Sequence, residues 1–162
     1  MIIKLISGKD KKYMNPDALS NVVQYIYNGV IKLPPRQQIW GCIGVIHDSD
    51  PDSIIHEMIS TKKDYALCGG VQCKHFMVSL GNMPKLKRKQ IIKKIRKMLM
   101  LFSDKYQIFY GVHYNINEFG WENYHIHIML NSIDMNRKRK ISITKQDLSD
   151  FKKRVWKIWS KV

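Results

Sequence analysis

Three histidines in the C-terminal half of the chain have the spacing of a metal site. His125 and His127 are separated by one residue, in a run of β-branched and aromatic residues that predicts a strand. Alternation along this strand places both imidazoles on one face and the apolar side chains between them on the other. If the strand pairs with residues 106–113 as an antiparallel hairpin, His113 lies opposite His125. All three imidazoles then point to the same open face of a sheet.

A histidine triplet of this kind can hold a divalent metal and leave coordination positions open for a substrate phosphate. Phosphoryl chemistry commonly uses magnesium or manganese, which we favour, whereas imidazole ligands also suit zinc, nickel or cobalt. Metal binding requires neutral imidazoles, so activity is expected to fall below a pH of roughly 6.5. The alternative is that the three histidines are polar side chains of a half-exposed strand.

The elements that position these histidines are expected in the order β, α, β, α, β, α, β, β, α. Hydrophobic periodicity predicts strands at residues 2–6, 41–46, 75–80, 106–113 and 124–130, with a loop containing Gly120 between the last two. Helices are predicted from about residue 16 to Gly29, from Pro51, beyond Pro84 and from about Thr144. The pattern predicts an α+β fold, in which helices pack on one face of a central, mainly antiparallel five-stranded sheet.

The whole chain, residues 1–162, is expected to form a single domain. It has no internal repeat, low-complexity tract or linker, and 162 residues can bury a substantial core. His75 lies in an otherwise apolar strand, so we interpret it as a core histidine or a DNA contact rather than as a fourth ligand. The three cysteines lack the paired spacing of a zinc knuckle and are interpreted as reduced thiols.

The charge balance indicates a polyanionic partner. Twenty-eight lysines and arginines against 13 acidic residues give a net charge of +15, which favours nucleic acid over the alternative of a membrane surface. No apolar run suits a signal peptide or a membrane span, so a bacterial cytoplasmic location and no membrane partner are expected.

The basic residues cluster in two segments, for which we predict contacts with DNA phosphates. The predicted DNA-binding residues are Lys85, Lys87, Arg88, Lys89, Lys93, Lys94, Arg96 and Lys97 in the first segment, and Arg137, Lys138, Arg139 and Lys140 in the second. Trp40, Phe119 and Trp121 are candidates for stacking on the bases of a single strand.

Three segments resemble the mobilisation relaxases of plasmids and transposons, which belong to the HUH endonuclease superfamily. Residues 110–115 and 123–131 are similar to the third motif of that family, which carries the histidines. Residues 22–28 are similar to the first motif, whose tyrosine attacks DNA, and residues 72–79 resemble the strand between the two motifs. One departure is Asn115, where the family usually has an aspartate; Asn131 or a carboxylate is the expected substitute.

The resemblance implies that Tyr25 is the nucleophile and that His113, His125 and His127 are the metal ligands. Helical geometry alone leaves Tyr27 as the alternative nucleophile, because the two tyrosines flank the apolar stripe of their helix on opposite sides. Relaxases place this tyrosine before the paired histidines, whereas rolling-circle initiators place it after them. No tyrosine follows His127, so for a complete chain the nucleophile is expected upstream.

The resemblance therefore implies a relaxase that nicks one strand at an origin of transfer through metal-dependent tyrosine transesterification. Its expected product is a 5′-phosphotyrosyl adduct, and its expected substrate is single-stranded or hairpin DNA, with accessory DNA-binding and coupling proteins as further partners. The alternatives are a rolling-circle replication initiator and a non-catalytic basic DNA-binding accessory protein.

Overall fold

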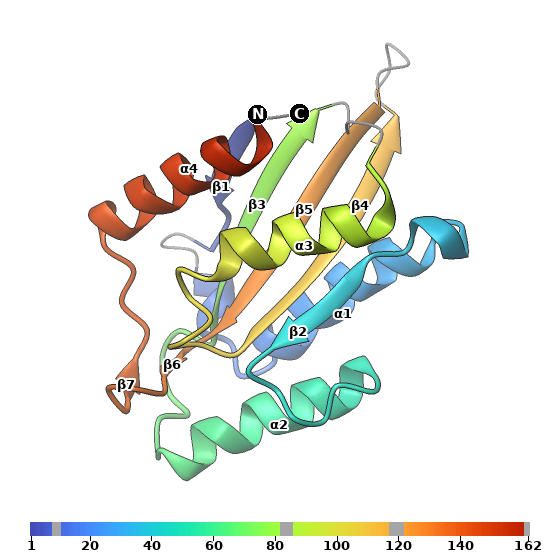
Figure 1. Cartoon of the computed structure of the whole chain (residues 1–162). Coiled ribbons are helices and arrows are strands. Elements are labelled where there is room, and N and C mark those ends of the chain that lie inside the picture. The colour runs from blue at the N-terminus through green and yellow to red at the C-terminus, as the bar shows by residue number, and fades with distance from the viewer. Residues whose placement is uncertain (8–10, 82–85, 117–121, 161–162) are drawn as a thin grey trace.

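The computed structural model describes residues 1–7, 11–81, 86–116 and 122–160 (Figure 1). Its main strands and helices follow the predicted order. They are β1 (Ile2–Leu5), α1 (Ala18–Ile31), β2 (Trp40–Ile43), α2 (Pro51–Asp64), β3 (Cys73–Gly81), α3 (Arg88–Leu99), β4 (Ile108–Ile116), β5 (Glu122–Asn131) and α4 (Lys145–Trp159). The sequence did not predict the short 3-10 helices η1 (Lys11–Met14) and η2 (Pro35–Gln37), or the ribbon of β6 (Ile133–Asp134) and β7 (Arg139–Lys140). The predicted loop at Gly120 lies outside the described residues.

The main sheet has five strands in the order β1-β3-β5-β4-β2, and every neighbouring pair is antiparallel. This confirms the predicted fold class. In the register of β4 and β5, His113 lies opposite His125 and Gly111 lies opposite His127. Because directly opposed residues share a face, the predicted parity of the three histidines is confirmed. The register of β3 and β5 places His75 on this face too, opposite Met129.

Helices cover both faces of the sheet, so the expectation of one covered face was wrong. Helices α3 and α4 lie on one face, and α1 and α2 lie on the other, which we call the histidine face (Figure 1). The physical reason is that the central strands carry large apolar side chains on both sides. Phe109 and Met129 are fully buried on the histidine face, as Ile126 and Ile128 are on the opposite one. The histidine face is therefore only partly open.

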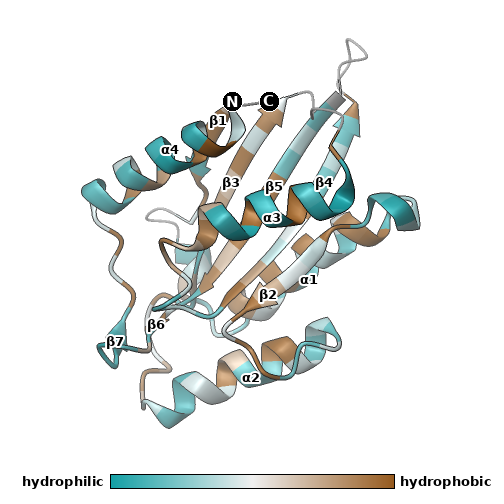
Figure 2. Cartoon of the chain, in the orientation of Figure 1, coloured by the Kyte–Doolittle hydropathy of each residue, from teal (hydrophilic) through white to brown (hydrophobic). Residues whose placement is uncertain are grey.

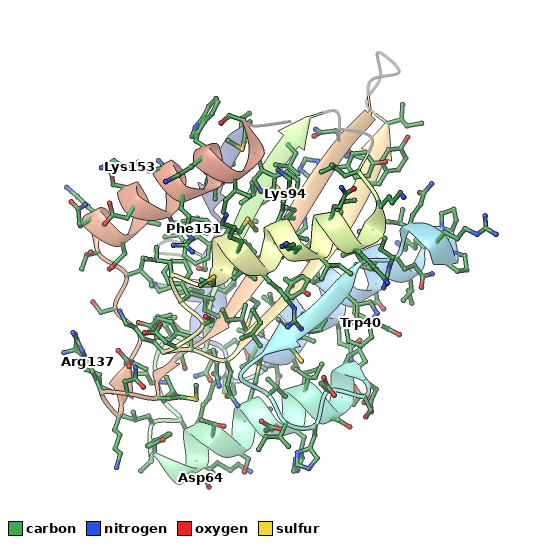
Figure 3. All side chains as sticks on the ribbon, viewed as in Figure 1. Trp40, Asp64, Lys94, Arg137, Phe151 and Lys153 are labelled. Carbon is green, nitrogen blue, oxygen red and sulfur yellow. The ribbon has the colours of Figure 1, made fainter. Side chains whose placement is uncertain are left out.

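The distribution of apolar and polar residues agrees with this layered arrangement of sheet and helices (Figure 2). The apolar residues concentrate in the strands and on the inner sides of the helices, while the outer sides of α3 and α4 are strongly hydrophilic. Phe151 lies on the side of α4 that faces the sheet, and Lys153 lies on its outer side (Figure 3). Over the described ranges, no helix combines the length and apolarity needed to cross a membrane.

Capping interactions stabilise the starts of α2 and α4. The carboxylate of Asp50 accepts a hydrogen bond from the backbone N–H of Ser53, directly before Pro51 at the start of α2. Thr144 and Asp147 form a capping box at the start of α4. The predicted end of α1 at Gly29 was wrong, since the helix continues to Ile31.

Candidate active site on the histidine face

The phenol of Tyr25 lies directly against the histidines. Its ring centroid is 5.4 Å from those of His113 and His127 and 6.1 Å from that of His75, with edge-to-face geometry in each case. The residue comes from the middle of α1, whose buried stripe of apolar side chains packs on β4 and β5. Tyr25 nevertheless remains 55% exposed. The structure therefore brings a solvent-accessible phenol to two of the three predicted metal ligands.

Two glycines allow α1 to come this close to the sheet. A Cβ at Gly111 would lie 2.6 Å from a methyl carbon of Ile26, so this position in β4 admits the helix. A Cβ at Gly29 would lie 2.2 Å from Nε2 of His113, so the imidazole occupies the space that a side chain would fill. Gly29 is a helix-interior residue that makes room for a ring, rather than the residue that ends the helix.

Replacing Gly29 with alanine tests this arrangement. In an unconstrained helix the change would stabilise the protein by about 1 kcal/mol, because alanine is the better helix former. Here the added methyl group collides with the ring of His113, so we expect a net loss of stability. Urea denaturation measures this effect. Gly69→Ala is the control, because no atom of the described residues lies within 4 Å of a Cβ at that position. A stabilised Gly29→Ala protein would contradict the prediction.

Four imidazoles lie on the histidine face, those of His75, His113, His125 and His127. Hydrogen bonds fix the orientation of three of them. Nε2 of His113 donates to the backbone carbonyl of Ile26 at 2.8 Å, which leaves the lone pair of the neutral ring on Nδ1. Nε2 of His75 and Nδ1 of His127 are 3.0 Å apart, and Nδ1 of His75 lies 3.2 Å from the hydroxyl of Tyr13. A chain of contacts thus runs from η1 through β3 to β5.

All four imidazoles are held in the neutral form. Burial, followed by the nearby His113, lowers the pKa of His127 to about 2, and burial lowers the pKa of His75 to about 4. Burial also lowers the pKa values of His113 and His125 from the usual 6.5. At neutral pH the four rings are therefore uncharged, and the lone pair of a neutral imidazole is able to bind a metal.

The donor set fits a divalent metal in its chemistry, although the rings are not arranged around a common point. Across the described segments, no three histidine, cysteine, aspartate or glutamate side chains are placed to share one ion. Two observations support the fit. The Nδ1 atom of His125 is buried without a hydrogen-bond partner in the described part of the chain, and His113 keeps its Nδ1 lone pair. Neutral imidazole nitrogens are the form that binds metals.

The remaining candidates lie further from the histidines. Tyr27 packs edge-to-face on Trp40 at 5.4 Å, away from the imidazoles. Asn131 is fully buried and bonds to the carbonyl of Met58 and the side chain of Gln107. It lies four residues along β5 from His127, a distance of about 13 Å in a strand, so it does not replace the orienting residue expected at Asn115. Asn115 itself is exposed, opposite Asn123.

Sequence reasoning missed the part of the site that is built by Tyr13 and His75. The apolar neighbours of His75 correctly indicated a buried histidine, which is only 3% exposed. Its contact with His127 depends on the register of β3 against β5, and two strands separated by about 40 residues carry no local signal for their register.

The predicted DNA-binding residues lie mostly on other surfaces than Tyr25. Helix α3 carries six of them on the opposite face of the sheet, Lys87 directly precedes that helix, and β7 with its turn carries four. Lys85, Phe119 and Trp121 fall outside the described residues. Lys94 donates to the carbonyl of Ile158 at the end of α4, and Lys140 donates to Val71 and Ser132, so both also hold the fold together. Trp40 packs beside Tyr27 and is partly buried.

Comparison with protein families adds to this geometry. Residues 33–161 match the family described as "Relaxase: MobA/VirD2-like, nuclease domain". The search of curated proteins and the search of solved structures returned no match. The matched range contains all four clustered histidines but begins after α1. The match therefore does not include Tyr25, whose contact with the histidines is a finding of the structure alone. The chain belongs to the MobA/VirD2-like relaxase nuclease-domain family, and so to the DNA-nicking enzymes of mobilisation.

Proposed function

We propose that this relaxase cuts one DNA strand at an origin of transfer by transesterification, with Tyr25 as nucleophile, and remains joined to the 5′ end of the cut strand. The observation that carries the proposal is the contact of the exposed Tyr25 ring with His113 and His127, at 5.4 Å between ring centroids. Tyr27, whose ring packs on Trp40, has no comparable environment.

In the proposed step the phenol oxygen of Tyr25 forms a bond to the scissile phosphorus, and the bond from phosphorus to the 3′ oxygen breaks. The electron pair of that bond leaves with the 3′ oxygen, which takes up a proton, and the phenol proton passes to water. One phosphodiester replaces another, so the reverse reaction can rejoin the strand without an energy source. A neutral phenol is a weak nucleophile, so this step needs stabilisation of the charge that develops.

His113, His125 and His127 are the residues that would hold the divalent metal, with magnesium or manganese favoured. When bound, such an ion would neutralise the charge that develops on the phosphate oxygens. Other groups of the chain orient two of these ligands. The Ile26 carbonyl orients the ring of His113, and His75 orients the ring of His127.

A labelled single-stranded oligonucleotide carrying a candidate origin, incubated with the protein and manganese, tests the proposal. The expected product on a denaturing gel is a protein–DNA adduct, and peptide mapping should locate the DNA on the segment that contains Tyr25. Hydrolysed DNA without an adduct would refute transesterification, and an adduct on another tyrosine would refute the assignment.

The outer side of α3 is proposed as an electrostatic binding surface for DNA. Lys93 and Lys97 project from this helix, which has six basic residues and no acidic one. Each phosphate contact contributes about 0.9 to the slope of log affinity against log salt. The double variant Lys93→Gln/Lys97→Gln is therefore expected to bind duplex DNA more weakly, with a slope about 1.8 shallower in fluorescence anisotropy titrations.

The matched control for this double variant removes two charges elsewhere. Lys63 in α2 and Lys145 at the start of α4 are both exposed and lie outside the predicted binding segments. Lys63→Gln/Lys145→Gln is expected to change the salt slope far less. If both double variants lost DNA affinity and salt slope equally, net charge would determine binding and the proposed role of the α3 surface would be wrong.

A further inference from the structure

An open cavity of about 370 Å³ adjoins the proposed nucleophile. It lies where α1, η1 and the end of β1 meet on the histidine face, and its lining includes Tyr25 and His75. Its remaining walls combine apolar side chains, among them Ile6 and Val22, with the polar groups of Lys12 and Asn21. The volume is at the lower end of the roughly 300–1,000 Å³ typical of small-ligand sites, which suits a single nucleotide.

We infer that this cavity binds the nucleotide on the 3′ side of the cut, the one that stays attached to Tyr25. The inference rests on the proposed function of Tyr25. A strand whose phosphate lies against the phenol must place one nucleotide on each side of that phosphate, and this cavity opens beside the phenol.

The stereochemistry of phosphoryl transfer selects between the two nucleotides. The attacking and leaving oxygens lie roughly in line on opposite sides of the phosphorus. The leaving 3′ oxygen and its nucleotide are thus directed away from the phenol, while the retained nucleotide stays next to it. A cavity that shares the Tyr25 side chain as a wall fits the retained nucleotide.

The groups around the cavity match the parts of a nucleotide. The apolar walls and the exposed ring of Tyr25 offer surfaces for a base. The amide of Asn21 carries both a donor and an acceptor, the combination that reads the edge of a base. The ammonium group of Lys12, which lies 5.3 Å from the centroid of the Tyr13 ring, adds positive charge for a phosphate.

The four deoxynucleoside 5′-monophosphates test the cavity without any cleavage. NMR titration should shift the signals of Asn21 and Ala18, which line the cavity, more strongly than deoxyribose 5-phosphate does, because only the nucleotides carry a base. Asn21→Ala and Lys12→Ala should each weaken nucleotide binding severalfold. Shifts confined to the basic residues of α3, or equal shifts with the sugar phosphate, would overturn the inference.

Matched controls lie nearby for both variants. Asn28 is an exposed asparagine on the same face of α1, two helical turns or about 10 Å beyond Asn21, and Lys11 is the neighbour of Lys12; neither lines the cavity. Asn28→Ala and Lys11→Ala should bind nucleotides like the unmodified protein. If they lose as much affinity as the cavity variants, the inference is overturned.

Abasic oligonucleotides test the same cavity during cleavage. Removing the base on the 3′ side of the cut should slow adduct formation about tenfold, the order expected for losing one stacked base, whereas an abasic site on the 5′ side should have a smaller effect. The reverse order would overturn the inference while leaving the nicking activity established. If no oligonucleotide forms an adduct, the proposed function fails, and the nucleotide titration still decides whether the cavity binds a nucleotide.

Discussion

Replacing Tyr25 with phenylalanine is expected to abolish covalent attachment to DNA, because the substitution removes the oxygen that we propose as the attacking group and leaves the ring in place. Loss of a nucleophile typically lowers such rates by several orders of magnitude, on the order of 10⁴-fold or more. DNA affinity should stay within about twofold, since we expect phosphate contacts to the basic surfaces to dominate binding. Adduct yield on denaturing gels and Kd from anisotropy measure the two quantities separately.

Tyr27→Phe is the matched control for this experiment. It makes the same chemical change two residues further along α1, where the ring packs on Trp40 at 5.4 Å. We expect the Tyr27→Phe protein to form the adduct at close to the normal rate. If Tyr25→Phe stayed active and Tyr27→Phe did not, the assignment of the nucleophile would be wrong.

Acidification from pH 7.5 to pH 5 is expected to destabilise the fold strongly. His75 and His127 are each 3% exposed, and burial lowers their pKa values to about 4 and about 2. In the unfolded chain both titrate near 6.5, so below that pH the unfolded state binds protons that the native state does not. The stability of the neutral cluster is therefore fully present above pH 6.5 and is lost as the pH falls toward 4.

The expected size of this loss is roughly 2 kcal/mol per histidine at pH 5, a large fraction of the 5–15 kcal/mol that stabilises a typical domain. Urea denaturation at a series of pH values measures it, and NMR titration of the histidine ring carbons identifies the groups responsible. A free energy of unfolding that is constant between pH 7.5 and 5 would show that these imidazoles accept protons in the native fold.

The site could be predicted from sequence wherever one short pattern determines it. Alternation along residues 124–130 separated His125 and His127 from Ile126 and Ile128, and the pairing parity of an antiparallel hairpin brought His113 to the same face. The order of strands and helices followed from hydrophobic periodicity and from helix-starting residues such as Pro51. These features depend on local geometry, which residue types report directly.

Features that depend on contacts between distant segments could not be predicted in this way. The sequence marks Gly29 as a helix terminator by its type, whereas its structural role depends on the ring of His113, 84 residues away. Helix α1 packs on the histidine face and α3 on the opposite face. The face that a helix covers depends on how the loops connect it to the strands, and the pattern of the helix itself does not indicate it. The cavity beside Tyr25 likewise requires η1, α1, β3 and the residue that follows β1 to meet.

The hydrogen bond from His113 to the carbonyl of Ile26 has a mechanical consequence. The acceptor lies one residue after Tyr25 in the same helix, so this bond joins the ring of His113 in β4 to the turn of α1 that carries the phenol. A displacement of α1 relative to β4 would therefore strain this bond, which links the position of the phenol to that of the imidazole.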